Sequence, residues 1–88
     1  MGEGATPADA SAIRSALAAE PRIETIVHMK TLYLGPDELL VAAKVSLAGA
    51  ATLTDVSAAI DGAERRIREA VPVARVIYLE PDVISATT

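Results

Sequence analysis

The feature that most constrains this fold is a pair of alternating apolar segments joined by the short turn "GPD" at residues 35–37. The first segment covers residues 23–34 and the second covers residues 38–47. Glycine gives the backbone freedom, proline fixes φ, and aspartate can hydrogen-bond to its own loop. Alternating segments on both sides of a short turn are typical of a β-hairpin, so the middle of the chain is predicted to be two long antiparallel strands.

The two segments differ in how cleanly they alternate. The second segment is predicted to point one apolar face at the core, namely Leu39, Val41, Ala43, Val45 and Leu47. Its other face is small and half apolar, which favours cover by a partner: Leu40, Ala42, Lys44 and Ser46. The first segment places Ile23, Thr25, Val27, Met29, Thr31 and Tyr33 on one face and Glu24, Ile26, His28, Lys30, Leu32 and Leu34 on the other. Neither face is cleanly polar and the segment is long for a strand, so a bulge partway along it is expected, which leaves the faces of residues 32–34 open.

Capping patterns predict a helix on each side of the hairpin. "TPAD" at residues 6–9 has a threonine cap, proline in the first position and an acid three residues after the cap, and the helix is expected to end before Pro21. "TLTD" at residues 52–55 is a second capping box, and its helix is expected to end before Pro72. The predicted apolar stripe of this second helix is Val56, Ile60, Ala63, Ile67 and Ala70. Its outer face is predicted to be solvated and to carry helix-spaced ion pairs.

A short third strand is expected over residues 75–80, stopped by Pro81. The order α-β-β-α-β predicts an α+β fold of the ferredoxin-like kind without its first strand, a two-layer sandwich of two helices on a three-stranded mixed sheet. Because the crossover between the second and third strands should be right-handed, these two strands are predicted to be parallel. The order of the strands in the sheet is left open.

The size of the chain favours a partner. A chain of 88 residues, with no cysteine and only two tyrosines as aromatic residues, can build only a small aliphatic core. An oligomer, a metal held by oxygen and imidazole groups, or attachment to a larger protein would supply the missing stability. A net charge of −4 and a single small basic cluster, "ERRIR", argue against a nucleic-acid partner. No apolar run approaches the ~20 residues that cross a bilayer.

Few residues could carry chemistry. His28 is the only histidine, and Glu80 and Asp82 flank Pro81. These groups can bind a divalent cation if the strands bring them together, but a strand histidine with no special role and solvated acids at the end of an edge strand explain them as well. No hydroxyl has an identifiable base partner and no set of polar groups converges, so the chain is not interpreted as an enzyme.

The runs "GEGATPADASAIRSAL", "IVHMKTLYLGPDELLVAAKVSL" and "AERRIREAVPVARVIYLEPD" together resemble the C-terminal cytoplasmic dimerisation domain of cation diffusion facilitator transporters. These are zinc-transporter-like antiporters of divalent cations and protons, and the resemblance covers residues 2–82. It implies a metallochaperone-like fold that forms a V-shaped homodimer at the cytoplasmic side of the cell membrane, as the soluble part of an integral membrane protein. Residues 1–6 would then be a linker stub after the last membrane helix, residues 7–82 the dimerisation domain, and residues 83–88 a C-terminal tail.

The resemblance also implies a function, which is homodimerisation and regulation of a Zn/Mn/Fe-type efflux transporter, with metal binding that tightens the V. The metal positions of zinc-transporting members fall here at about Val27, Ala43, Tyr78 and Glu80, and only the acid is kept. A divalent cation such as zinc would therefore be held by His28 and Glu80 across the dimer, and no other cofactor is implied.

Two alternatives stay open. The first is a free-standing metallochaperone-like carrier. The lack of a Cys-x-x-Cys loop argues against a carrier of soft metals. The second is a small-molecule-sensing ferredoxin-like domain, which needs a ligand pocket at a dimer interface.

Overall fold

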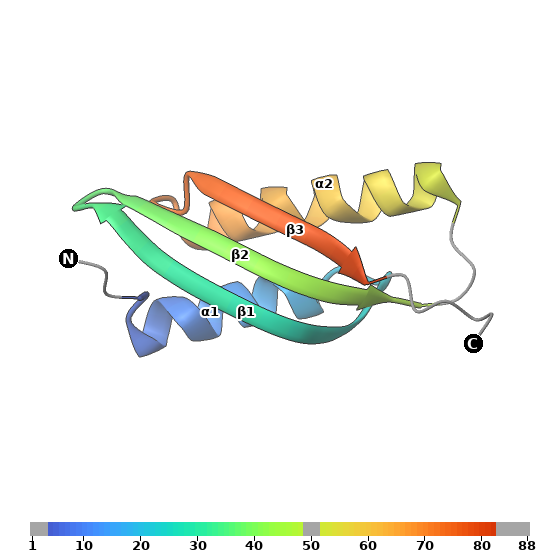
Figure 1. Ribbon diagram of the computed structural model, residues 1–88, viewed down its shortest axis with the longest axis horizontal. Coiled ribbons are helices and arrows are strands. Elements are labelled where there is room, and N and C mark those ends of the chain that lie inside the picture. The colour runs from blue at the N-terminus through green and yellow to red at the C-terminus, as the bar shows by residue number, and fades with distance from the viewer. Residues whose placement is uncertain (1–3, 49–51, 83–88) are drawn as a thin grey trace.

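The computed structural model describes residues 4–48 and 52–82, which form two helices and three strands (Figure 1). In chain order these are α1 (Pro7–Ala18), β1 (Ile23–Gly35), β2 (Glu38–Leu47), α2 (Leu53–Ala70) and β3 (Val76–Asp82). The predicted α-β-β-α-β order and the α+β class are confirmed. Of the bounds expected from the sequence, residues 1–3 of the linker and the whole tail at 83–88 lie outside the described residues.

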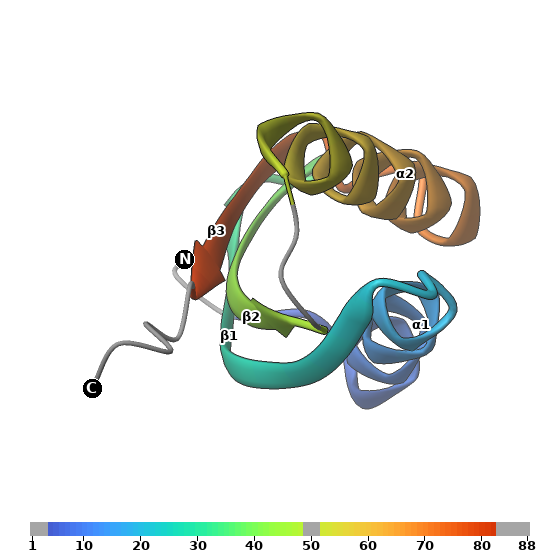
Figure 2. The same ribbon diagram turned by 90° about the vertical axis from the view of Figure 1, so that its right-hand side faces the viewer.

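The three strands form one mixed sheet in the order β1-β2-β3. β1 and β2 are antiparallel, and β2 and β3 are parallel, as the right-handed crossover predicted. The sequence left the strand order open, and the structure places β2 in the middle. Both helices lie on the same face of the sheet (Figure 2), where α1 contacts β1 and α2 contacts β3. The result is the predicted two-layer sandwich.

The two helices begin where the capping patterns predicted. The Thr6 hydroxyl accepts a hydrogen bond of 3.2 Å from the Asp9 amide at the start of α1. At the start of α2, Thr52 and Asp55 form a reciprocal capping box, with hydrogen bonds of 3.1 Å and 3.4 Å. These bonds satisfy amides that a helix start leaves without intrahelical partners.

β1 contains two bulges in its first half. Its register against β2 shifts between Ile23 and Thr25 and again between Ile26 and His28. The first shift turns Ile26 toward the helices, where it packs against the core, so the predicted faces of residues 25–27 are wrong. The second shift restores the original alternation, because two one-residue insertions cancel. Met29, Lys30 and Thr31 lie on the predicted faces. Of the residues whose faces the sequence left open, Leu32 points away from the helices and Leu34 is exposed, and a third register shift lies between Tyr33 and Gly35.

β3 continues through Pro81 to Asp82, so the prediction that Pro81 ends the strand is wrong. Pro81 is paired with Val45 in the parallel ladder. An edge strand tolerates proline, because one side of its backbone has no ladder partner to lose.

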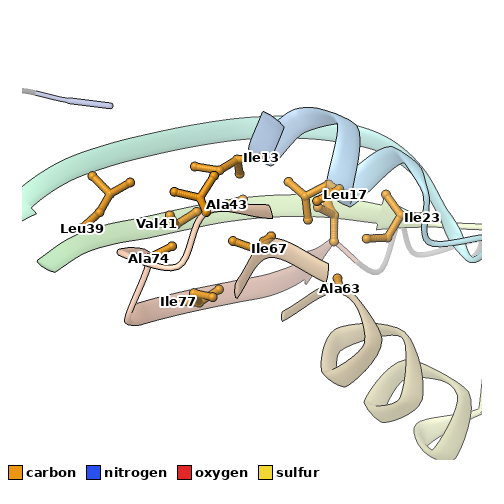
Figure 3. Packing of buried hydrophobic residues seen from close by; sticks show 13 residues of the cluster. Ile13, Leu17, Ile23, Leu39, Val41, Ala43, Ala63, Ile67, Ala74 and Ile77 are labelled. Atoms are coloured by element: carbon orange, nitrogen blue, oxygen red, sulfur yellow. The ribbon is translucent and has the colours of Figure 1, made fainter. Parts of the chain in front are cut away.

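The core is aliphatic and lies between the helices and the inner face of the sheet (Figure 3). Its largest fully buried side chains are Ile13, Leu17, Leu39, Val41, Val45 and Ile67. The predicted inner residues of β2 are confirmed. On α2 the buried line is Ala59, Ala63 and Ile67, whereas Ala70 is exposed. Residues four apart share a helix face, so this line is narrower than the predicted stripe.

Residues just before α1 are attached to β1. The Ala5 amide donates a hydrogen bond of 2.9 Å to the Thr31 hydroxyl, and Ala5 packs against the core. A Cβ on Gly4 would lie 3.0 Å from the same hydroxyl oxygen, so glycine permits this close approach. Residues 4–5, which the sequence assigned to a linker, are therefore held against the sheet.

Candidate functional site

The face of the sheet that turns away from both helices is uncovered in the described part of the chain (Figure 2). We call it the outer face. It carries large apolar side chains with high exposed fractions, namely Val27 (49%), Leu32 (36%), Leu34 (51%) and Tyr78 (66%). One face of an antiparallel sheet can lie in water, but such faces are normally polar. An apolar face of this kind marks a surface that binds something.

The outer face contains an open hollow of about 560 Å³. We call it the outer hollow, and its lining residues come from all three strands: Val27, His28, Lys30, Ala42, Ala43, Lys44, Tyr78 and Glu80. The lining includes both predicted metal ligands and all the positions to which the resemblance assigned metal binding. The structure therefore brings these separate parts of the sequence to one place.

His28 and Glu80 lie in the same row of the outer face, but they are not neighbours. Lys44 on the central strand is paired with His28 on one side and with Glu80 on the other. Since adjacent strands are roughly 4.8 Å apart, the backbones of His28 and Glu80 are separated by about twice that distance. Lys44 Nζ lies 4.0 Å from Glu80 Oε2, with side chains that are 40% and 72% exposed.

The residues of the outer hollow do not fit a metal ion within one chain. Nowhere in residues 4–48 and 52–82 do three or more histidine or acidic side chains gather closely enough to hold one. Zinc sites in proteins normally use three or four protein ligands at about 2.0–2.3 Å. Here Lys44 on the central strand separates the two candidate donors, and its ammonium group lies 4.0 Å from the Glu80 carboxylate. The assignment of His28 and Glu80 as ligands therefore stays a prediction, and it needs a second copy of the chain.

The other acid of the predicted set lies outside the outer hollow. Asp82 is paired with Ser46, one row beyond the row that contains Lys44. It therefore shares a face of β3 with Glu80, as residues two apart in a strand do.

Two functional candidates were missed from the sequence, and both are lysines. Lys30 and Lys44 line the outer hollow and give it positive charge. The sequence does single out Lys44, because it is the one charged residue of β2 after Glu38 and its neighbours on the outward side of that strand are small or apolar. Its position between His28 and Glu80 could not be read, since it depends on the strand order.

No helix in the described part of the chain is long and apolar enough to span a membrane.

Comparisons with known proteins agree with this fold. The sequence profile of the family described as "Cation efflux protein, cytoplasmic domain" matches residues 5–82. A search of the curated proteins finds no match.

Among solved structures, similar ones include three variants of the MamM C-terminal domain. A nickel form has a TM-score of 0.80 at 10% identity, over 89% of this chain and 98% of that chain. A cadmium form has a TM-score of 0.79 at 10% identity, over 88% and 95%. A copper form has a TM-score of 0.78 at 11% identity, over 85% and 92%. At such low identity the likeness confirms the ferredoxin-like fold alone.

Proposed function

Because this chain belongs to the family of cation efflux protein cytoplasmic domains, we propose that it forms the homodimer that regulates a divalent metal cation efflux transporter. The transporter would be of the Zn/Mn/Fe type and proton-coupled, with its membrane-embedded part elsewhere in the same protein. The domain would lie on the cytoplasmic side of the cell membrane.

The observation that carries this proposal is the uncovered apolar outer face. A chain of this size gains stability mainly by burying apolar surface, and its helices cover only one side of the sheet. Leu32, Leu40 and Val76 form one row across the three strands of the outer face, and Leu34 and Tyr78 lie near that row. A second copy would bring an identical apolar row, as a two-fold interface requires. The partner that the outer face favours is therefore another copy of the chain.

Metal regulation is the finer part of the proposal. In a two-fold dimer the outer hollows of two copies can face each other, which would bring His28 of one copy toward Glu80 of its partner. Because the two-fold axis repeats this contact, the dimer offers two such pairs of donors, each with one imidazole and one carboxylate. The MamM variants solved in nickel, cadmium and copper forms support metal binding by domains of this fold.

Sedimentation equilibrium of the purified chain tests the proposal, once in chelator and once with zinc. We expect a homodimer in chelator. A chain that stays monomeric at every concentration in both conditions contradicts the proposed function. A dimer that tightens with zinc supports the two-copy metal site, whereas an unchanged dimer supports dimerisation without that site.

The size of the outer hollow favours one alternative enough to test it. A volume of about 560 Å³ lies within the range of small-molecule sites, and the lining has two lysines and a tyrosine. A sensor domain of the ferredoxin-like kind would show a rise in melting temperature with one member of an amino-acid or nucleotide panel. The transporter-domain proposal expects no such rise.

A further inference from the structure

Lys44 lines the outer hollow from the central strand, between the two predicted metal ligands. It is paired with His28 in the β1–β2 ladder and with Glu80 in the β2–β3 ladder. All three residues line the hollow, and Lys44 Nζ lies 4.0 Å from Glu80 Oε2. The carboxylate that would bind a metal ion therefore already faces a cation, and that cation belongs to the chain.

This ammonium group would disfavour a metal ion for three reasons. A protonated lysine has no lone pair, so it cannot be a ligand. It neutralises part of the charge of Glu80, which lowers the attraction of that carboxylate for a second cation. It also repels a divalent ion placed between His28 and Glu80, because charges of the same sign a few ångströms apart repel each other even in water.

A second lysine strengthens the effect. Lys30 also lines the outer hollow, and its strand partner Ala42 is two residues before Lys44 on the same face of β2. Two lysines therefore line the same hollow as one carboxylate and one imidazole. Among the described lining residues the balance of charge disfavours a divalent cation.

We infer that Lys44 competes with a divalent cation for Glu80 in the outer hollow and thereby weakens the zinc response of the proposed dimer. The inference rests on the proposed function, since it concerns how the proposed dimer is regulated. The lysine supplies part of the positive charge that a metal ion would bring, so the dimer would need more zinc to tighten.

Calorimetric titration of zinc chloride into the whole chain tests this inference. Lys44→Gln removes the charge but keeps a long polar side chain, and Lys44 is exposed enough for the fold to tolerate the change. We expect this variant to bind zinc about tenfold more tightly than the wild type, or better. Lys44→Arg keeps the positive charge and should bind zinc as weakly as the wild type.

The double variant Lys44→Gln with His28→Asn removes one donor and should lose most of the gain. Equal zinc affinity in the wild type and in Lys44→Gln overturns the inference, and so does an equal gain in Lys44→Arg. Circular dichroism checks the fold of each variant, and Lys44→Met provides a second uncharged side chain.

Sedimentation equilibrium on the same samples reports dimerisation separately from zinc binding. If the chain is monomeric but Lys44→Gln gains zinc affinity, the proposed dimer is wrong and the action of Lys44 is supported. If the chain is dimeric and no variant differs in zinc affinity, the inference alone is overturned.

Discussion

Glu20 is the only charged residue that the described part of the chain buries, with 6% of its surface exposed. It follows α1, and its Oε2 lies 3.8 Å from Arg66 Nε on α2. The carboxylate lies against Gly62, where a side chain would collide with it. Glycine inside a helix costs roughly 0.5–1 kcal/mol relative to alanine, so its presence at this place is explained by the room it leaves for Glu20.

We predict that the effect of Gly62→Ala depends on Glu20. In the wild type the new Cβ would lie 2.6 Å from Glu20 Oε2, so the carboxylate must shift, and the disturbance of its ion pair with Arg66 offsets the gain in helix propensity. In a Glu20→Ala background the same change should stabilise the protein by about 0.5–1 kcal/mol. Urea unfolding of the four variants of this double-mutant cycle, at one protein concentration, measures the difference. Equal effects of Gly62→Ala in both backgrounds would show that the two residues are not coupled.

The two strands of the hairpin differ in how well their ends and faces can be predicted from the sequence. β2 has an alternation that is strong enough to predict both its ends and its inner face. β1 has polar and apolar residues on both faces, and its three register shifts are defined only relative to its partner strand. A single sequence does not contain that register, so residues 25–27 were placed on the wrong faces.

The candidate site was predictable only in part, for the same reason. His28 and Glu80 could be chosen by chemistry alone, and the fold does place both in the outer hollow. The distance between them depends on which strand is central, and the sequence pattern does not decide this. The sequence therefore predicts that Lys44 faces outward, but it does not predict that Lys44 lies between His28 and Glu80.

At the scale of elements, we predict that a hydrogen bond to Thr31 holds the residues before α1 against the sheet. Thr31→Val keeps the shape of the side chain and removes the acceptor of the 2.9 Å hydrogen bond from the Ala5 amide. A partly buried amide without its partner costs about 1 kcal/mol or more. Hydrogen exchange at the Ala5 amide should become faster, and urea unfolding should show a loss of about that size.

Thr25→Val is the matched control, because it is the same substitution in the same strand at an exposed position. If both variants exchange the Ala5 amide at the same rate, the hydrogen bond does not hold this segment.

At the scale of the whole molecule, we predict that the outer face and not the helical face forms the dimer. Leu34→Glu places a charge in the apolar part of the outer face, and each dimer would bury that charge twice. We expect the dimer to weaken roughly tenfold or more, while the fold of the monomer stays intact. Sedimentation equilibrium gives the dissociation constant.

Leu53→Glu is the matched control on the other layer, since Leu53 is 89% exposed at the start of α2. It should leave the dimer unchanged. A dimer that is weakened by Leu53→Glu and not by Leu34→Glu would place the interface on the helical side instead.

The proportions of the molecule have a mechanical consequence. It measures 42 × 24 × 18 Å. The start of α1 lies in the half that holds the hairpin turn, and β3 ends toward the opposite end (Figure 1). The Ala5–Thr31 hydrogen bond attaches residues 4–5 to that first half. In an elongated body that is attached near one end, a small rotation at the attachment gives a larger displacement at the far end. An elongated sheet to which the chain before α1 is attached near one end is thus suited to amplifying small angular movements.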